Sequence, residues 1–464
     1  MLFRTGRAPE AHCPLPTDVV EPASPTTRAM SEVVLARHHL LGLYLLLGLT
    51  ISSWLARLPT VRTSLGLSTG NLGTVMLLGA VGSLLTILVA GALVTRFGPR
   101  RTMLASALLF TIGYVLLGLG PALARIDVFA VGVVVFSAAI ALGNVPLNVE
   151  SVVIERRMGR TVVPHFHAAF SVGAVLGSGL GAAAAWGEVP VVVQFGAVAI
   201  VALLWRLRSV PLSVLAPLPD DGPARAAPGQ PQGAEPAQPP ERVAGLRTSL
   251  RAWRERRTLL LGVVVLAAAL SEGSANTWLA IAVVDGFGQA EALAAVVFGV
   301  FVASMTVARL SGTWLIDRFG RYLAVAASGA ASLAGLVLFA LAPSLPLAVL
   351  GVVGWGLGAG LIIPIAMSAV SGDPLSAAGR VAVVSAFAST ASIAAPPLIG
   401  LAAEVMGVRH ALLLIAGVML AGVLLSRNVR EPDFSGPAEE RRDHPATDLT
   451  PVPRDAQLVV EVLR

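Results

Sequence analysis

Charged and amide side chains stand inside long apolar stretches of this sequence. Glu272 and Asn276 are four residues apart in one such stretch, a spacing that places them on one face of a helix. A charged group at membrane depth costs on the order of 2.5–3.5 kcal/mol, so each one needs a reason. A carboxylate in apolar surroundings favours its protonated form, and Glu272 is therefore a candidate proton carrier. The alternative is a structural carboxylate bonded to a neighbouring helix.

A second polar group lies around Pro146, a residue that frees a backbone carbonyl and bends a helix. Asn144 and Asn148 share one helix face, and Glu150 follows two residues later. Glu150 is a second candidate for proton binding, or else an ion-pair partner of Arg309 at a gate.

Five further residues have both a functional and a structural interpretation. His167 titrates near neutral pH and could relay protons, or it could be a structural residue near a helix end. Arg309 could pair with an acidic residue or bind an anionic substrate. Arg57 could extend to the membrane surface or serve a substrate or a gate. Trp54 and Trp278 could anchor at the membrane surface or stack on a sugar ring. No His, Cys or carboxylate spacing suggests a metal site.

The surrounding sequence predicts that membrane helices position these residues. Of the 464 residues 55% are hydrophobic and only 13% are charged, whereas soluble domains carry about 25% charge. An apolar span needs about 20 residues. Such blocks occur at 39–58, 70–95, 102–121, 128–155, 164–186, 190–207, 258–284, 292–316, 321–342, 345–370, 380–403 and 407–427. The sequence therefore predicts an all-α membrane protein with twelve transmembrane helices.

The arginines predict the orientation and argue against nucleic-acid binding. The net charge is +6, but the basic residues form short clusters between apolar blocks, as in cytoplasmic loops. The poorer set of loops holds only Arg57, Arg62, Arg125 and Arg409. We therefore expect both termini in the cytoplasm. The expected regions are a disordered leader at 1–36, a six-helix half at 37–208, a linker at 209–257 with an amphipathic helix near 244–256, a second half at 258–428 and a disordered tail at 429–464.

Two loops repeat at corresponding places in the two halves, as in duplicated transporters. The repeated residues are Gly91, Arg96, Gly98 and Arg101 in the first copy and Asp317, Arg318, Gly320 and Arg321 in the second. These loops resemble the loop signature of the major facilitator superfamily, and the resemblance covers about residues 37–428. It implies two pseudo-symmetric six-helix bundles around a central cavity. It also implies that the spans with Asn144, Asn148, Glu272 and Asn276 line this cavity, which makes these residues candidates for substrate binding.

Several stretches are similar to a bacterial inner-membrane branch of that superfamily related to the fucose permease, whose members mostly have no assigned substrate. They are Trp54 to Pro59, Asn148 to Glu150, His167 to Gly173, Glu272 with Trp278, and Pro396 to Gly400. The chain departs from the family in the first loop, where Thr95 replaces the usual Asp. The resemblance implies that Asp317 serves as a latch at the start of the fifth span, near residues 161–165.

The resemblance implies a secondary active transporter that moves a small solute across the cytoplasmic membrane of a bacterium by alternating access. Coupling to protons is a hypothesis that Glu272, Glu150 and His167 motivate. We expect a monomer in the lipid bilayer, with no cofactor and no enzymatic activity, because no nucleotide-binding loop and no nucleophile–base set are present. Two alternatives stay open: a multidrug or metabolite efflux antiporter, and a non-transporting membrane receptor or assembly factor.

Overall fold

The computed structural model describes residues 25–216, 252–370 and 377–429, and the regular secondary structure in these ranges is helical. The first group of helices is α1 (Pro25–Leu55), α2 (Leu58–Ser64), α3 (Thr69–Phe97), α4 (Pro99–Ala122), α5 (Ile126–Met158), α6 (Val163–Trp186) and α7 (Val191–Ser213). The second is α9 (Arg256–Phe287), α10 (Glu291–Leu341), α11 (Leu345–Val370), α12 (Ala377–Met406), α13 (Val408–Ala411), α14 (Leu414–Leu425) and the 3₁₀-helix η2 (Ser426–Val429).

Eleven helices within the described residues are long and apolar enough to cross a membrane. One of them, α10, has 51 residues, far more than the roughly 20 that one crossing needs. Its backbone leaves the helical conformation at Gly320, with φ 78° and ψ 159°, so two crossings meet there. Counting α10 as two crossings brings the total to twelve, and the predicted all-α membrane fold is confirmed.

The two loop-signature copies share one backbone conformation. Gly98, between α3 and α4, has φ 81° and ψ 161°, close to the φ 78° and ψ 159° of Gly320. This region of backbone space is open essentially to glycine alone, because a Cβ atom would clash there. The glycine in each copy is therefore required by the turn itself, which lets one membrane helix end and the next begin within a single residue.

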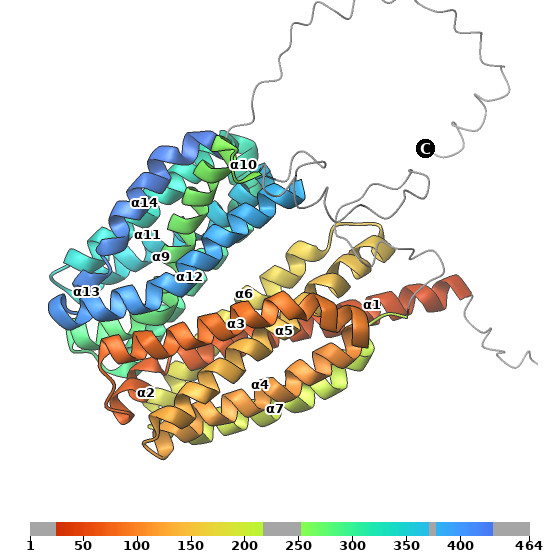
Figure 1. Ribbon diagram of the computed structural model, residues 1–464, viewed down its shortest axis with the longest axis horizontal. Helices are drawn as coiled ribbons and strands as arrows, with labels where there is room; N and C mark the ends of the chain where they lie inside the picture. Colours follow the sequence, from red (N-terminus) through yellow and green to blue (C-terminus); the bar gives the residue numbers. More distant parts are fainter. Residues whose placement is uncertain (1–24, 217–251, 371–376, 430–464) are drawn as a thin grey trace, which may run out of the picture. The chain divides into compact units, whose positions relative to one another are not determined.

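Within each group the helices pack side by side (Figure 1): α1 lies against α6 and α7, α4 against α5 and α7, α10 against α11, and α9 against α12 and α14. Glycines make the closest approaches. A Cβ atom at Gly173 would lie 1.9 Å from the backbone oxygen of Leu45, and one at Gly177 would lie 2.1 Å from that of Leu49. The two groups meet where α3 packs against α12 and α6 against α10.

The structure differs from the expected leader at 1–36 and describes only a small part of the expected amphipathic helix near 244–256. Helix α1 begins at Pro25, so residues 25–36 are helical and not part of a disordered leader; the sequence has no glycine or further proline there to stop the helix. Most of the expected amphipathic helix near 244–256 lies outside the described residues, as do 1–24 and 430–464. The limits assigned to the two halves, the linker and the tail stay predictions.

Candidate functional site

Glu272 forms an ion pair near the middle of α9. The Nη2 atom of Arg309, on α10, lies 3.2 Å from Oε1 and 3.4 Å from Oε2 of Glu272. The Nε atom of Arg309 also faces the backbone oxygen of Gly360 at 3.4 Å. The two charged side chains are 21% and 29% exposed, so water can reach them. Arg309 thus has Glu272 as its ion-pair partner, and its pairing with Glu150 stays a prediction.

A polar cluster from the first group of helices contains two of the predicted asparagines and a tyrosine. The hydroxyl of Tyr44, on α1, donates to Oδ1 of Asn148, on α5, at 3.0 Å. Nδ2 of Asn148 donates to the backbone oxygen of Asn144 at 2.8 Å. The ring of Tyr44 also meets that of His167, on α6, edge to face at 5.7 Å. Three helices therefore place Asn144, Asn148 and His167 around Tyr44.

His167 connects the tyrosine cluster to the ion pair. It is exposed, and it lies close enough to Arg309 for their charges to interact. Helices α6 and α10, which carry these two residues, pack against each other across the two halves. The structure therefore brings together five of the predicted residues, Asn144, Asn148, His167, Glu272 and Arg309, along the contact between the halves. We call this set, with Tyr44, the central cluster.

Arg57 lies at one end of the bundle, where α1 ends, in a network of its own. Its Nη1 donates to Oε1 of Gln194 at 2.8 Å and its Nη2 to the backbone oxygen of Val189 at 3.1 Å, which fixes it within the first half. Its Nε lies 3.2 Å from a carboxylate oxygen of Glu291, at the start of α10 in the second half. Glu291 also accepts hydrogen bonds from the backbone N–H, at 3.0 Å, and the hydroxyl of Thr60.

The same end carries further contacts between the halves. Arg62 pairs with Asp285 at 2.7 Å. The hydroxyl of Ser68 donates to Glu404 at 2.6 Å, and Glu404 also accepts from the backbone N–H of Gly70 at 3.1 Å. The side-chain hydrogen bonds and ion pairs identified between the halves in the described residues thus gather at this end, which we call the Arg57 end.

Close backbone packing completes the Arg57 end. A Cβ atom at Gly73, on α3, would lie 2.5 Å from the backbone oxygen of Pro396, on α12. In turn, a Cβ atom at Gly400 would lie 2.5 Å from the backbone oxygen of Thr69. Helices α3 and α12 can approach this closely only because both positions lack a side chain. The Arg57 end is therefore held closed by packing as well as by charge.

The structure corrects three surface assignments. Arg57 is only 3% exposed, so it does not extend to the membrane surface, and its position agrees with the gate alternative. Trp54 is buried against Phe129, Phe136 and Phe195, and Trp278 is 0% exposed. Neither tryptophan anchors at a membrane surface, and neither ring is open to a sugar in this conformation. Both were misplaced because they stand near span ends in the sequence.

The start of α6, where Asp317 was expected to bind, is capped by an acid of the same half. Asp317 is exposed and forms no hydrogen bond or ion pair within the described residues, whereas Glu155 accepts from the backbone N–H groups of Val162 and Val163 at 2.7 and 2.8 Å. These N–H groups belong to the start of α6, where an anion is favoured. Glu155 thus caps α6 from within its own half, and the latch role of Asp317 stays a prediction.

Two further candidates, Glu150 and Asn276, follow residues of the central cluster along α5 and α9. Glu150 is fully buried in α5, and proton binding there stays a prediction. Asn276 is half-buried one turn beyond Glu272. In the loop signature, Arg321 is half-buried. The other residues of the signature are exposed or half-exposed, namely Gly91, Arg96, Gly98, Arg101, Asp317, Arg318 and Gly320.

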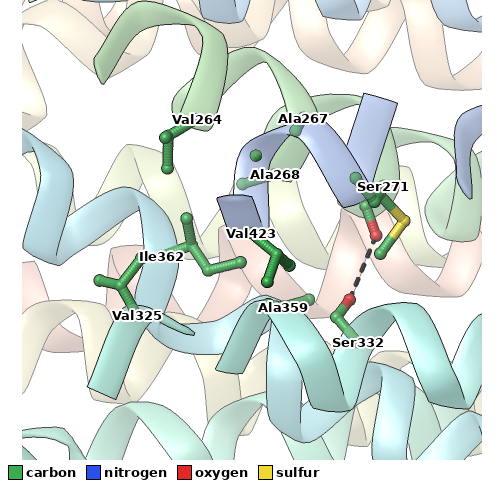
Figure 2. A pocket seen from close by; sticks show the side chains of 12 residues that line it. Val264, Ala267, Ala268, Ser271, Val325, Ser332, Ala359, Ile362 and Val423 are labelled. Atoms are coloured by element: carbon green, nitrogen blue, oxygen red, sulfur yellow. Dashed lines mark hydrogen bonds between the residues drawn. The ribbon is translucent and has the colours of Figure 1, made fainter. Parts of the chain in front are cut away.

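Two small cavities lie inside the halves. One has a volume of about 20 Å³ and is bounded by Val264, Ser271, Ser332 and Ile362 among others (Figure 2), with the two serine hydroxyls 3.4 Å apart. The other, of about 30 Å³, lies between Asn144 and Arg206, whose guanidinium sits 3.6 Å above the ring of Phe110. Each volume suits one or two water molecules, so neither cavity could hold a solute.

Sequence reasoning missed Tyr44, Glu155, Gln194 and Glu291. Only Glu155 had a local signal: Gly159, with φ 62°, turns the chain back so that an acid shortly before a helix start can cap that helix. Glu291 and Arg57 are 234 positions apart, and no local pattern relates them.

Comparison with known proteins fits this architecture of paired helical halves with polar residues between them. The profile of the Major Facilitator Superfamily matches residues 40–382, so the chain belongs to that superfamily and is a multi-pass membrane transporter, not an enzyme. It is 31% identical over 369 residues to the Uncharacterized transporter y4wD of Sinorhizobium fredii, covering 79% of this chain and 90% of that one.

Solved structures share the fold at low sequence identity. The nucleoside transporter NupG superimposes with a TM-score of 0.65 at 15% identity, covering 85% of this chain and 98% of that chain. The Escherichia coli fucose:proton symporter FucP gives 0.57 at 14% identity, covering 86% and 100%. The expected membership of the superfamily is confirmed.

Proposed function

We propose that the chain is a secondary active transporter that moves a small solute by alternating access, and that this structure is closed at the Arg57 end. The observation that carries the proposal is the gathering of contacts between the halves at one end, where Arg57 pairs with Glu291 and Arg62 with Asp285. These pairs join helices of different halves, so rocking of the halves would break them together while the bonds within each half persist.

Proton coupling is the finer part of the proposal, and Glu272 is its site. The carboxylate is partly exposed beside one cationic partner, Arg309, at 3.2 Å. Protonation of Glu272 removes the ion pair and leaves the guanidinium free to bind an acceptor on the solute, such as a hydroxyl or a carboxylate. Loss of the proton restores the pair and displaces the solute. His167, exposed beside Arg309, offers a second group for the same exchange.

The test begins with a ligand. The purified chain is screened by thermal shift against a library of sugars, nucleosides and small metabolites at pH 5.5 and 7.5. A solute that stabilises the protein is then followed in proteoliposomes with an imposed pH gradient. We expect its accumulation to follow the gradient. Accumulation with an inward proton gradient indicates symport, and accumulation with an outward one indicates antiport, as in efflux.

Two variants sharpen the experiment. Glu272→Gln keeps the shape of the side chain but cannot exchange a proton, so binding and solute exchange should persist while gradient-driven accumulation is lost. Asp127→Asn is the matched control, because Asp127 is exposed and pairs only with neighbouring Arg125 in the described residues. Transport by the unaltered protein that ignores the gradient would refute proton coupling. A ligand that binds but never crosses the bilayer would instead favour a receptor.

The proposed setting is the cytoplasmic membrane of a bacterium, with the chain as a monomer. The arginine-poor loops lie at the Arg57 end, so the positive-inside tendency supports an outward-facing Arg57 end and cytoplasmic termini. Protease protection in oriented membrane vesicles tests this orientation. Cleavage of the tail from the side of the Arg57 end would contradict it.

A further inference from the structure

A polar hollow lies between α1 and α7, on a part of the first half that the transport proposal does not use. Its volume is about 350 Å³, and it is lined by His38, His39, Gly42, Trp205, Arg208 and Ser209. His38, Trp205 and Arg208 are exposed, and His39 is half-buried. Helix α1 also carries Tyr44 of the central cluster, but no member of that cluster lines the hollow. The hollow is therefore separate from the candidate site for the solute.

The floor of the hollow is formed by specific contacts. A Cβ atom at Gly42 would lie 3.1 Å from Cζ2 and Nε1 of Trp205, so the glycine lets the indole rest directly on α1. Nδ1 of His39 lies 3.2 Å from the hydroxyl of Ser209 and ties the two helices together. Nδ1 of His38 lies 2.8 Å from the backbone oxygen of Val34 and donates a hydrogen bond to it, because a carbonyl can only accept. The other ring nitrogen, Nε2, is therefore left for a ligand.

The depth of the hollow can be worked out from both helices. His38 precedes Leu55, the last residue of α1, by 17 positions, and Arg208 follows Val191, the first residue of α7, by 17 positions. At about 1.5 Å per residue both lie about 26 Å from the Arg57 end of their helix. The hydrocarbon core is about 30 Å thick, so the basic groups lie at its opposite boundary, where lipid headgroups begin.

The surface next to the hollow is apolar. On α7 the side chains of Ile200, Val201 and Leu204 are 61%, 56% and 62% exposed. They precede Trp205 and Arg208 along the helix and so lie nearer the middle of the membrane. Apolar side chains followed by a tryptophan and then by basic groups match the order of acyl chain, interface and headgroup in a phospholipid.

From this order we propose that the hollow binds one anionic glycerophospholipid. Arg208 binds its phosphate, since a guanidinium offers paired donors to phosphate oxygens, and Nε2 of His38 donates a second hydrogen bond when the imidazole ring carries both protons. Trp205 lies at the level of the glycerol esters, and the acyl chains run along Leu204 and Ile200. The lipid would fasten α1 to α7 at the end opposite the Arg57 end, whatever solute is carried.

The test measures retained lipid. The full chain is purified, exchanged into detergent containing phosphatidylglycerol or phosphatidylcholine, and examined by native mass spectrometry. We expect one phosphatidylglycerol to remain bound and phosphatidylcholine to be lost. Each basic group near a membrane surface changes lipid binding about fivefold, so Arg208→Gln should weaken retention about fivefold and the His38→Gln, Arg208→Gln double variant more. Arg208→Lys should keep most of it.

Controls separate this site from general attraction to charge. Arg427→Gln removes an exposed basic group in η2, outside the hollow, and should leave retention unchanged. Equal retention of both lipids, or an equal loss with Arg427→Gln, would overturn the proposal. So would displacement of the lipid by inorganic phosphate at millimolar concentration, because the site would then bind free anions.

A second measurement covers the case in which the double variant folds poorly. In nanodiscs, phosphatidylglycerol with brominated acyl chains should quench the tryptophan emission of the unaltered protein more than brominated phosphatidylcholine does. Trp205→Phe should remove that difference, although six of the seven tryptophans remain. A difference that survives this substitution would place the lipid elsewhere and refute the proposed site.

Discussion

The ion pair between Arg57 and Glu291 gives the sharpest test of the proposed gate. Its atoms are 3.2 Å apart, and the two side chains are only 4% and 15% exposed. At an effective dielectric constant of about 20, two charges at that distance attract by about 5 kcal/mol. Desolvation offsets part of this, and close charge pairs at interfaces couple by roughly 1.5–7 kcal/mol. We therefore take about 2–3 kcal/mol as the net free energy by which this ion pair stabilises the closed state.

Glu291→Gln should therefore raise the population open at the Arg57 end by about 30- to 150-fold, since each 1.4 kcal/mol is a factor of ten. Glutamine keeps one oxygen for the backbone N–H of Thr60, and its amide nitrogen can donate to the Thr60 hydroxyl, so the change mainly removes the charge. Arg62 and Asp285 form the matched control, because they span the same gap but are 15% and 32% exposed. Asp285→Asn should cost less than about 1 kcal/mol and so change the population less than about fivefold.

A cysteine at Val61 reports the open population. Val61 is 0% exposed in α2, which packs against α9 of the other half, and the natural Cys13 is replaced by serine. The rate of maleimide labelling in proteoliposomes is proportional to the fraction of time the gate is open. An unchanged rate with Glu291→Gln, or an equal rise with Asp285→Asn, would refute the argument that the more buried Arg57 pair stabilises the closed state more than the Arg62 pair does.

Three further predictions follow from local geometry. Gly73→Ala, whose Cβ would lie 2.5 Å from a backbone oxygen of α12, should speed the same labelling, whereas Gly417→Ala has open space and should not. The hydrogen bond from Arg380 lowers the pKa of Glu255. The ion pair therefore stabilises the protein at pH values above the ordinary carboxyl pKa of 4.5, and this stabilisation is lost as the pH falls below that value. The difference in Tm between the natural protein and Arg380→Gln should therefore shrink in acid. Glu155→Gln weakens the cap of α6 and should lower the Tm, at a cost of about 0.5–2 kcal/mol.

The fold was largely predictable because lipid imposes a simple rule on sequence. Each crossing needs a continuous apolar block, and such blocks can be counted without knowing which helices touch. The duplicated loop was visible because Gly98 and Gly320 must both be glycine for the turn to form. The family followed from that repeat, and the match to residues 40–382 confirms it.

The candidate site was only partly predictable, and the reason lies in its long-range contacts. Polar residues inside apolar blocks drew attention to Glu272, Arg309 and His167, since burial cost can be read from local sequence. Which acid pairs with Arg309 depends on how α9 meets α10, so the local sequence did not identify Glu272 as its partner. Tyr44 was overlooked because a tyrosine in a span carries no charge.

Position near a span end misled the interpretation of Arg57 and the two tryptophans. Such residues usually reach the membrane surface, which is a statistical expectation for a single helix. Here the ends of several helices converge, and neighbouring helices cover them, so Trp278 is 0% exposed and Arg57 is 3% exposed. A hydropathy profile contains no information on which helices lie at that end.

The shared backbone conformation of Gly98 and Gly320 restricts which residues can occupy one position of the repeated loop but not another. The turn admits no other residue at either position, so neither glycine can drift without straining the hairpin it joins. Three positions earlier, the side chains are free to diverge, and they are a threonine at 95 and an aspartate at 317. The two copies can thus carry different side chains on the same turn. A single substitution at such a position can make the two halves behave differently in the proposed gating.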